Sequence, residues 1–200
     1  MKLFHAAASP FVRKVEMVLH LTGQSAEVER VDGAGTPVAP NEGVCGANPL
    51  GKIPCLLLED GTALYDSRVI CRFLDTKAAS GLYPSGDGEF AALTIEALAD
   101  GLMDAAVLGV YEARVRPEEL RYQPWVQAQL SKVHRGLGEL ESACGTLGET
   151  VTIAHIGVGA ALGYLDFRYP DLGWREGRPR LTAWFEAYSA RPEMQATAPA

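Results

Sequence analysis

The stretch from Asn48 to Ser67 limits the fold of this chain more than any other part of the sequence. It contains a turn, an apolar strand entered through a proline, a tight turn at Asp60-Gly61, a second short strand and a helix start. A glycine at the tight turn tolerates the positive φ that a hairpin needs. Pro54 cannot donate to a sheet ladder, so we expect it at the first residue of an edge strand or in a special peptide geometry.

A helix is expected at the end of this stretch, where Asp66 or Ser67 can accept hydrogen bonds from its first N–H groups. An exposed strand edge that meets a helix N-terminus offers backbone groups and positive dipole charge to a small peptide that carries a carboxylate. The stretch therefore predicts a hairpin, a helix and a candidate peptide site at their junction.

The chain before this stretch completes a compact α/β unit. Apolar residues recur at helical spacing after Pro10, which suits the first helical position, with Ser9 at the cap. The expected elements are strands at 1–4 and 27–31, helices at 10–21 and 67–77, and a long irregular loop at 32–47 that can hold one helical turn.

The second half of the chain has no convincing strand pattern. Residues 79–88 contain three glycines, one proline and two serines, which predicts a linker between a domain at 1–78 and a second domain at 89–200. Apolar residues recur at helical spacing in four later segments, so the second domain is expected to be all-α. The predicted helices lie around 95–110, 125–140, 153–167 and 181–188.

Composition excludes several classes of function. The chain is ordinary in composition, with 48% hydrophobic and 22% charged residues, and its net charge of −7 argues against a nucleic-acid binder. No apolar run approaches the roughly 20 residues that span a bilayer, and the N-terminus does not resemble a signal peptide. The four cysteines are scattered and the histidines show no metal spacing, so we expect no metal, no disulfide framework and a cytoplasmic protein.

Several motifs occur together in a recognisable order. Ser9-Pro10 opens the first helix, Asn-Pro-Leu-Gly-Lys-Ile-Pro at 48–54 precedes the hairpin, and Asp66-Ser67 opens the next helix before an all-α half. In this order and spacing the whole chain resembles the cytosolic glutathione transferase superfamily. It is most similar to small bacterial, serine-type members with Ser-Pro-Phe-Val-Arg-Lys, here 9–14, and Arg-Pro-x-x-x-x-Thr, here 191–197.

The resemblance implies a thioredoxin-like N-terminal domain with a cis peptide before Pro54, followed by an all-helical C-terminal glutathione transferase domain. It also implies that glutathione, as co-substrate, lies along the edge strand at that proline. Ser9 matches the catalytic hydroxyl that activates the thiol. The residues implied for glutathione binding are Lys52 at the glycyl end, Ile53 and Pro54 at the cysteinyl unit, and Asp66 and Ser67 at the γ-glutamyl end.

The chemistry of these residues agrees with the implied roles. A thiol with a pKa near 8.5 is mostly protonated at pH 7, and a hydroxyl donor at a helix N-terminus stabilises the reactive thiolate. Each side chain also has a purely structural alternative, since Ser9, Asp66 and Ser67 can act as helix caps. Phe11 and Arg13 are further site candidates, and an ion pair is the alternative role for Arg13.

Family resemblance also implies a homodimer built on the long helix that starts at 89. Asp100 lies where many relatives direct a carboxylate toward the partner subunit's γ-glutamyl amine, and the alternative is a solvated acidic face formed with Glu96 and Asp104. His155 stands where many relatives carry Asp, which alters the reciprocal cap of the buried helix. Helix phase places four residues in a second-substrate pocket: Met103, Val107, Tyr111 and Tyr164.

The leading hypothesis is a glutathione transferase that activates the thiol of bound glutathione for attack on a small electrophile. A glutathione-binding protein with little turnover, and a glutathione-dependent disulfide or peroxide reductase, are the alternatives. No cysteine lies between residues 1 and 44, which disfavours a reductase that uses its own thiol at the first helix. A fold does not decide among these reactions.

Overall fold

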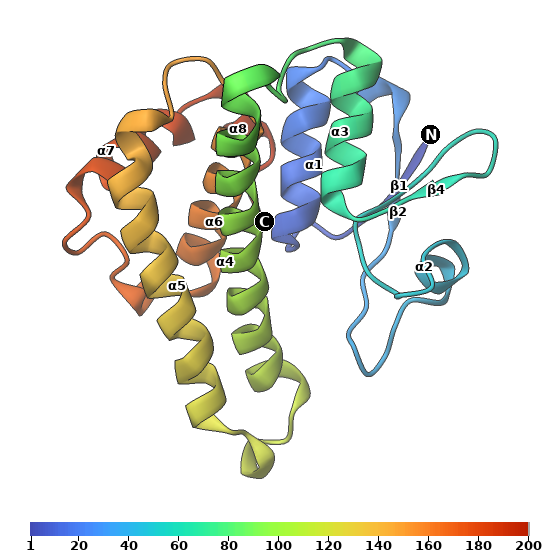
Figure 1. The fold of residues 1–200 in the computed structure, drawn as a ribbon. Coiled ribbons are helices and arrows are strands. Elements are labelled where there is room, and N and C mark those ends of the chain that lie inside the picture. The colour runs from blue at the N-terminus through green and yellow to red at the C-terminus, as the bar shows by residue number, and fades with distance from the viewer. Residues whose placement is uncertain (200) are drawn as a thin grey trace. The chain divides into compact units, whose positions relative to one another are not determined.

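The computed structural model describes residues 1–199, and they form two compact units (Figure 1). The first unit comprises Met1–Tyr83 together with the terminal segment that starts at Ala196. The second comprises Pro84–Gln195, so the division falls inside the segment at 79–88 that was predicted as a linker.

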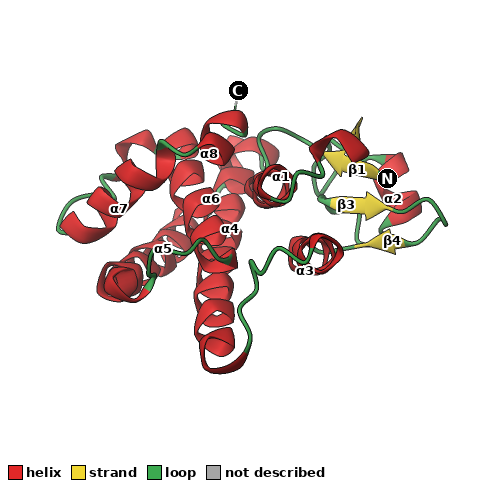
Figure 2. Cartoon of the chain, turned by 90° about the horizontal axis from the view of Figure 1, so that it is seen from above, coloured by secondary structure: helices red, strands yellow, loops and turns green. Residues whose placement is uncertain are grey.

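The first unit is built on a four-stranded sheet with the order β2-β1-β3-β4. β1 pairs in parallel with β2 and antiparallel with β3, which in turn pairs antiparallel with β4. Helices α1 and α3 lie side by side on one face of the sheet, with α2 on the other side (Figure 2). The elements are β1 (Lys2–His5), α1 (Pro10–Leu21), β2 (Glu29–Asp32), α2 (Glu42–Ala47), β3 (Cys55–Leu57), β4 (Ala63–Leu64) and α3 (Ser67–Ala78).

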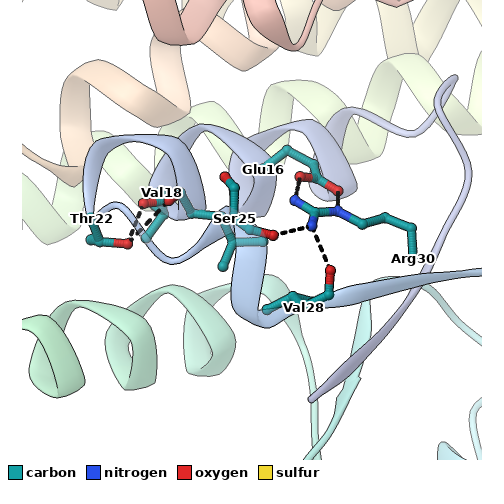
Figure 3. Close-up of polar contacts among 7 residues, drawn as sticks. Glu16, Val18, Thr22, Ser25, Val28 and Arg30 are labelled. Carbon is teal, nitrogen blue, oxygen red and sulfur yellow. Dashed lines mark hydrogen bonds and ion pairs between the residues drawn. The ribbon is translucent and has the colours of Figure 1, made fainter.

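The connection from α1 to β2 is held by a partly buried ion pair between Arg30 and Glu16 (Figure 3). The Arg30 guanidinium contacts both carboxylate oxygens of Glu16 on α1, at 3.1 and 2.6 Å. It also donates to the backbone carbonyls of Ser25 and Val28. These carbonyls belong to a turn at Ser25–Glu27 and its exit, which explains why β2 starts at Glu29 and not at 27 as predicted.

The hairpin forms at Asp60-Gly61 as predicted, with Gly61 at φ +87° and Leu58 N donating to Thr62 O at 2.8 Å. The hairpin adds β4 to the sheet, and β3 is therefore an internal strand between β1 and β4. Of the two alternatives expected for Pro54, the first residue of an edge strand is wrong for this reason, whereas the structure has the special peptide geometry. Pro54 directly precedes β3, and its peptide bond with Ile53 is cis.

The second unit is entirely helical within the described residues, which agrees with the prediction. None of its helices, nor any other helix in the part described, is long and apolar enough to cross a membrane. A short last helix was not predicted from the sequence. The helices are α4 (Glu89–Val115), α5 (Gln123–Ala143), α6 (Ile153–Arg168), α7 (Pro179–Ser189) and α8 (Pro192–Ala196).

Helix α6 is the buried centre of the second unit, and every residue from Ile153 to Leu165 is buried. Such a helix tolerates glycines only against close neighbours. Gly159 has such a neighbour, because a Cβ at this position would lie 2.5 Å from the Tyr188 ring. The altered cap at the start of α6 is formed by an imidazole, since Nδ1 of His155 accepts from Thr152 N–H at 3.2 Å.

Candidate functional site

The strand register brings three of the predicted site segments to one end of the first unit's sheet. Phe4 of β1 faces Cys55 of β3, so the end of β1, which leads to Ser9, adjoins the start of β3 after Pro54. Leu64 at the end of β4 faces Leu56, so Asp66 and Ser67 follow at the same end. Segments far apart in the sequence therefore meet where β3 begins.

Ser9 caps α1, and its hydroxyl oxygen accepts from Val12 N–H at 3.3 Å. A serine hydroxyl has one donor and two acceptor positions, so this bond leaves its O–H able to donate. The hydroxyl also lies at the positive end of the dipole of α1. The cap role and the thiol-activating role are therefore compatible in one side chain.

The loop before Pro54 is organised by Asn48, which is 2% exposed. Its side-chain amide donates to the carbonyl of Lys52 at 2.8 Å and accepts from Leu50 N–H at 3.0 Å. The Lys52 side chain is exposed, while Ile53 is half-buried. Sequence reasoning placed Asn48 in a turn and missed that its buried amide holds the backbone of a predicted binding residue.

Asp66 is the N-cap of α3 and accepts from Arg68 N–H at 3.1 Å. Its carboxylate also pairs with the Arg68 guanidinium at 2.8 Å. Partial burial acts to raise the pKa of Asp66, but hydrogen bonds from Arg68 and the charges of Arg68 and Lys14 outweigh it and lower the pKa. Asp66 is therefore a carboxylate at neutral pH, able to accept from an ammonium group, and the neighbouring Ser67 is 2% exposed.

Arg13 and Phe11, the further site candidates on α1, differ in burial and in their contacts. Arg13 is 8% exposed, and its Nε donates to the hydroxyl of Thr197 at 3.4 Å. The two sequence motifs at 9–14 and 191–197 thus meet through this pair. Phe11 is half-buried at the second position of α1. A site role for either residue stays a proposal.

In the second unit, α4 and α6 pack against each other, so residues of the two helices lie close together. Gly157 of α6 packs on Ala99 of α4, and the Tyr169 hydroxyl donates to Ala106 O at 2.7 Å. The pocket candidates on these helices range from buried to partly exposed. Met103 and Tyr164 are buried, and Val107 and Tyr111 are partly exposed.

The acidic row on α4 is not a solvated face. Glu96 is 2% exposed and Asp100 is 7% exposed, whereas Asp104 is exposed. The alternative of a simple solvated face for all three carboxylates is therefore wrong. A contact of Asp100 with a partner subunit's ligand stays a proposal. The described residues contain no cluster of metal-ligating side chains.

The two units are a thioredoxin-like α/β unit and an all-helical unit, and a serine, a cis-proline and an Asp-Ser pair lie at one end of the sheet. Comparison with protein families identifies this combination. Residues 8–77 match the model "Glutathione S-transferase, N-terminal domain", and residues 123–187 match "Glutathione S-transferase, C-terminal domain". The chain belongs to the glutathione S-transferase family.

Individual relatives agree with this assignment over their full length. The chain is 35% identical over 204 residues to the uncharacterized GST-like protein YibF of Escherichia coli (strain K12), covering 100% of this chain and 98% of the relative. A glutathione transferase family member from Pseudomonas fluorescens Pf-5, solved with bound glutathione, is 47% identical with a TM-score of 0.97, covering 100% and 98%. A structure from the same organism with bound S-(propanoic acid)-glutathione is 46% identical with a TM-score of 0.92, covering 100% of both chains.

Proposed function

We propose that this protein is a glutathione transferase that binds glutathione at the start of β3 and activates its thiol for attack on a small electrophile. The observation that supports this most directly is the geometry of Ser9. Its hydroxyl keeps a free donor position, at the sheet end where Pro54 and the Asp66-Ser67 pair also lie. The relatives solved with glutathione support the same ligand.

Each part of glutathione has a proposed partner at this sheet end. Asp66 accepts from the γ-glutamyl ammonium, and Ser67 binds the adjacent carboxylate at the first turn of α3, where helix N–H groups favour an anion. Ile53 offers its backbone to the cysteinyl unit beside Pro54. Lys52, whose carbonyl Asn48 holds, reaches the glycyl carboxylate with its exposed ammonium.

The reaction needs no thiol or metal from the protein. Ser9 donates to the glutathione sulfur and stabilises the thiolate, whose proton passes to solvent. The thiolate then forms a C–S bond with the electrophilic carbon, and either a leaving group departs with its electron pair or the new carbanion takes a proton from solvent. Thiolate, not thiol, is the nucleophile, so the hydroxyl raises the reactive fraction at neutral pH.

The proposal is tested by the pKa of bound glutathione in Ser9→Ala. Loss of the Ser9 bond should raise that thiol pKa by about one unit or more, because one unit corresponds to about 1.4 kcal/mol of differential interaction. Turnover at neutral pH should fall at least about ten-fold and recover partly at higher pH, while glutathione affinity stays nearly normal. Thiolate absorbance near 240 nm followed against pH measures this directly. Identical titrations in wild type and Ser9→Ala would show that Ser9 is only a cap.

Activity assays on the wild type and the Ser9 variants distinguish a glutathione transferase from a reductase and from a binding protein. Conjugation with a generic aryl halide should be measurable, and reduction of disulfides and peroxides should be much slower. Ser9→Cys should favour mixed-disulfide chemistry with glutathione, since it places a thiol at the same helix N-terminus. Tight glutathione binding with no turnover in any assay would instead identify a binding protein.

We also propose a homodimer through the region of α4, with Asp100 near the partner subunit's bound glutathione. Two large apolar side chains of α4 are exposed within a single chain, Phe90 at 76% and Leu108 at 42%. A partner subunit that packs on α4 would remove these two side chains from water. The second-substrate pocket is proposed around Met103, Val107 and Tyr111 of α4 and Tyr164 of α6.

The product of the proposed reaction is a glutathione conjugate. The 46% identical relative holds S-(propanoic acid)-glutathione, whose sulfur substituent ends in a carboxylate. We propose that conjugates of this kind also bind to the present protein.

A further inference from the structure

Asn48, which follows α2, uses its backbone and its side chain to fold the turn after it. Its carbonyl accepts from Gly51 N–H at 2.8 Å. Its side-chain oxygen accepts from Leu50 N–H at 3.0 Å, and its side-chain nitrogen donates to the carbonyl of Lys52 at 2.8 Å. Because Asn48 is buried, the Lys52 carbonyl points toward a group inside the first unit.

The orientation of this carbonyl also fixes the N–H of the next residue. Neither of the two cis peptide bonds within residues 1–199 joins Lys52 to Ile53, so the peptide between these residues is trans. In a planar trans peptide the C=O and N–H bonds point in opposite directions. The Ile53 N–H therefore points away from the buried Asn48 amide.

The backbone of Ile53 has hydrogen-bonding capacity that the chain does not use. Within the part of the chain that the structure describes, neither its N–H nor its carbonyl forms a hydrogen bond. Its side chain, by contrast, packs on Gly33, where an added Cβ would lie 2.8 Å from Ile53 Cγ2. Peptide groups of a partly shielded residue are normally paired. A bound peptide can supply both partners by pairing as a short strand.

We propose that Asn48 is a positioning residue for glutathione: by holding the Lys52 carbonyl, it directs the Ile53 N–H toward the carbonyl of the ligand's cysteinyl unit. The inference rests on the proposed function, which places that unit beside Pro54. It adds the side chain that sets the orientation of the binding peptide. Without the Asn48 donor this peptide can rotate, and the ligand must order it on binding, at a cost in affinity.

Asn48→Asp separates the two hydrogen bonds of this side chain. A carboxylate can still accept from Leu50 N–H, but it cannot donate to the Lys52 carbonyl. Titration calorimetry with S-methylglutathione, which has no free thiol, measures binding without the thiol chemistry. The affinity should fall about 3- to 10-fold in Asn48→Asp, the factor for one neutral hydrogen bond. Asn48→Ala should lose at least as much.

Asn41→Asp is the matched control for the added charge. Asn41 is the N-cap of α2, where its side chain accepts from Val44 N–H at 3.1 Å, and aspartate is an equally good cap. This variant adds the same charge at the other end of α2 and leaves the bond to the Lys52 carbonyl in place. Its affinity for S-methylglutathione should equal that of the wild type.

A second measurement follows the Ile53 N–H itself by hydrogen exchange. Bound S-methylglutathione should slow the exchange of this amide about ten-fold in the wild type, at a free ligand concentration of about ten times the dissociation constant. At the same fractional saturation, Asn48→Asp should lose most of this protection. A merely structural role of Asn48 would not change the protection of this one amide by ligand.

Each outcome decides the inference. Unchanged exchange of Ile53 in the wild type with ligand bound would overturn it and leave thiol activation by Ser9 intact. Wild-type affinity and protection in Asn48→Asp would also overturn it, as would an equal loss in Asn41→Asp. If Asn48→Asp does not fold, Asn48→Ala decides by the same two measurements. Failure of the wild type to bind glutathione or S-methylglutathione would overturn the proposed function as well.

Discussion

At the scale of single residues, the candidate site combines capping and ligand chemistry in the same side chains. Ser9 accepts one backbone bond and keeps its proton for donation. Asp66 caps α3 and is held as a carboxylate by Arg68. Capping fixes the rotamers of these side chains, so the ligand meets groups that lose little freedom on binding.

Ser67→Ala should weaken glutathione binding about ten- to a hundred-fold, because it removes a charge-assisted hydrogen bond worth roughly 1.5–3 kcal/mol. Helix α3 should survive, since Asp66 and not Ser67 is its cap. Titration calorimetry measures the change, with Ser131→Ala on an exposed position of α5 as control. Unchanged affinity in Ser67→Ala would remove Ser67 from the site.

At the scale of elements, α6 depends on two unusual positions. The first is His155, which completes the capping box with a neutral imidazole. Its Nδ1 accepts from Thr152 N–H at 3.2 Å, and its Nε2 lies 3.3 Å from Gly148 O. Only the neutral ring can accept at Nδ1 and donate at Nε2. The box therefore depends on pH in a way that a carboxylate box would not.

We expect the protein to lose stability as pH falls below about 6.5, the ordinary pKa of histidine. Burial, opposed by the backbone bond to Gly148, lowers the pKa of His155, so the unfolded chain binds this proton more readily than the folded one. The free energy of unfolding must then rise with pH in this window. Urea unfolding at a series of pH values measures the slope, and His155→Asp should reduce it. An equal slope in both proteins would contradict the role of His155.

The second unusual position of α6 is Gly159. Gly159→Ala should destabilise the protein by about 1–3 kcal/mol despite a better helix propensity, because the new methyl would overlap the Tyr188 ring. Gly138→Ala is the matched control, since a Cβ there meets nothing within 4 Å on an exposed face of α5. That change should stabilise by about 0.5–1 kcal/mol. Thermal unfolding distinguishes the two, and equal shifts would show that close packing does not constrain α6.

At the scale of the whole molecule, the proposed homodimer predicts a mass of about twice 21.4 kDa in sedimentation at micromolar concentration. Phe90→Glu should shift the equilibrium toward the monomer by placing a charge in the interface. Val38→Glu, at a side chain that is 75% exposed in the first unit, should not. A wild-type mass near that of one chain would refute the dimer.

Much of this architecture could be predicted from local pattern. The helix from Pro10 to Leu21, the hairpin at Asp60-Gly61 and the all-helical second unit follow from periodicity, caps and turn chemistry, and all are present. These signals act within a few residues of chain. The order of the motifs also predicted the glutathione S-transferase family, which the comparisons confirm.

The sequence by itself therefore determined most of the elements and their order, although not the short helix α8 or the start of β2. Only the tertiary structure decided that β3 is internal, that Asn48 holds the carbonyl of Lys52, and that Arg13 meets Thr197. The physical reason is that strand order, burial and charge pairing depend on residues distant in the chain, whereas helix caps and turns are stabilised by neighbours.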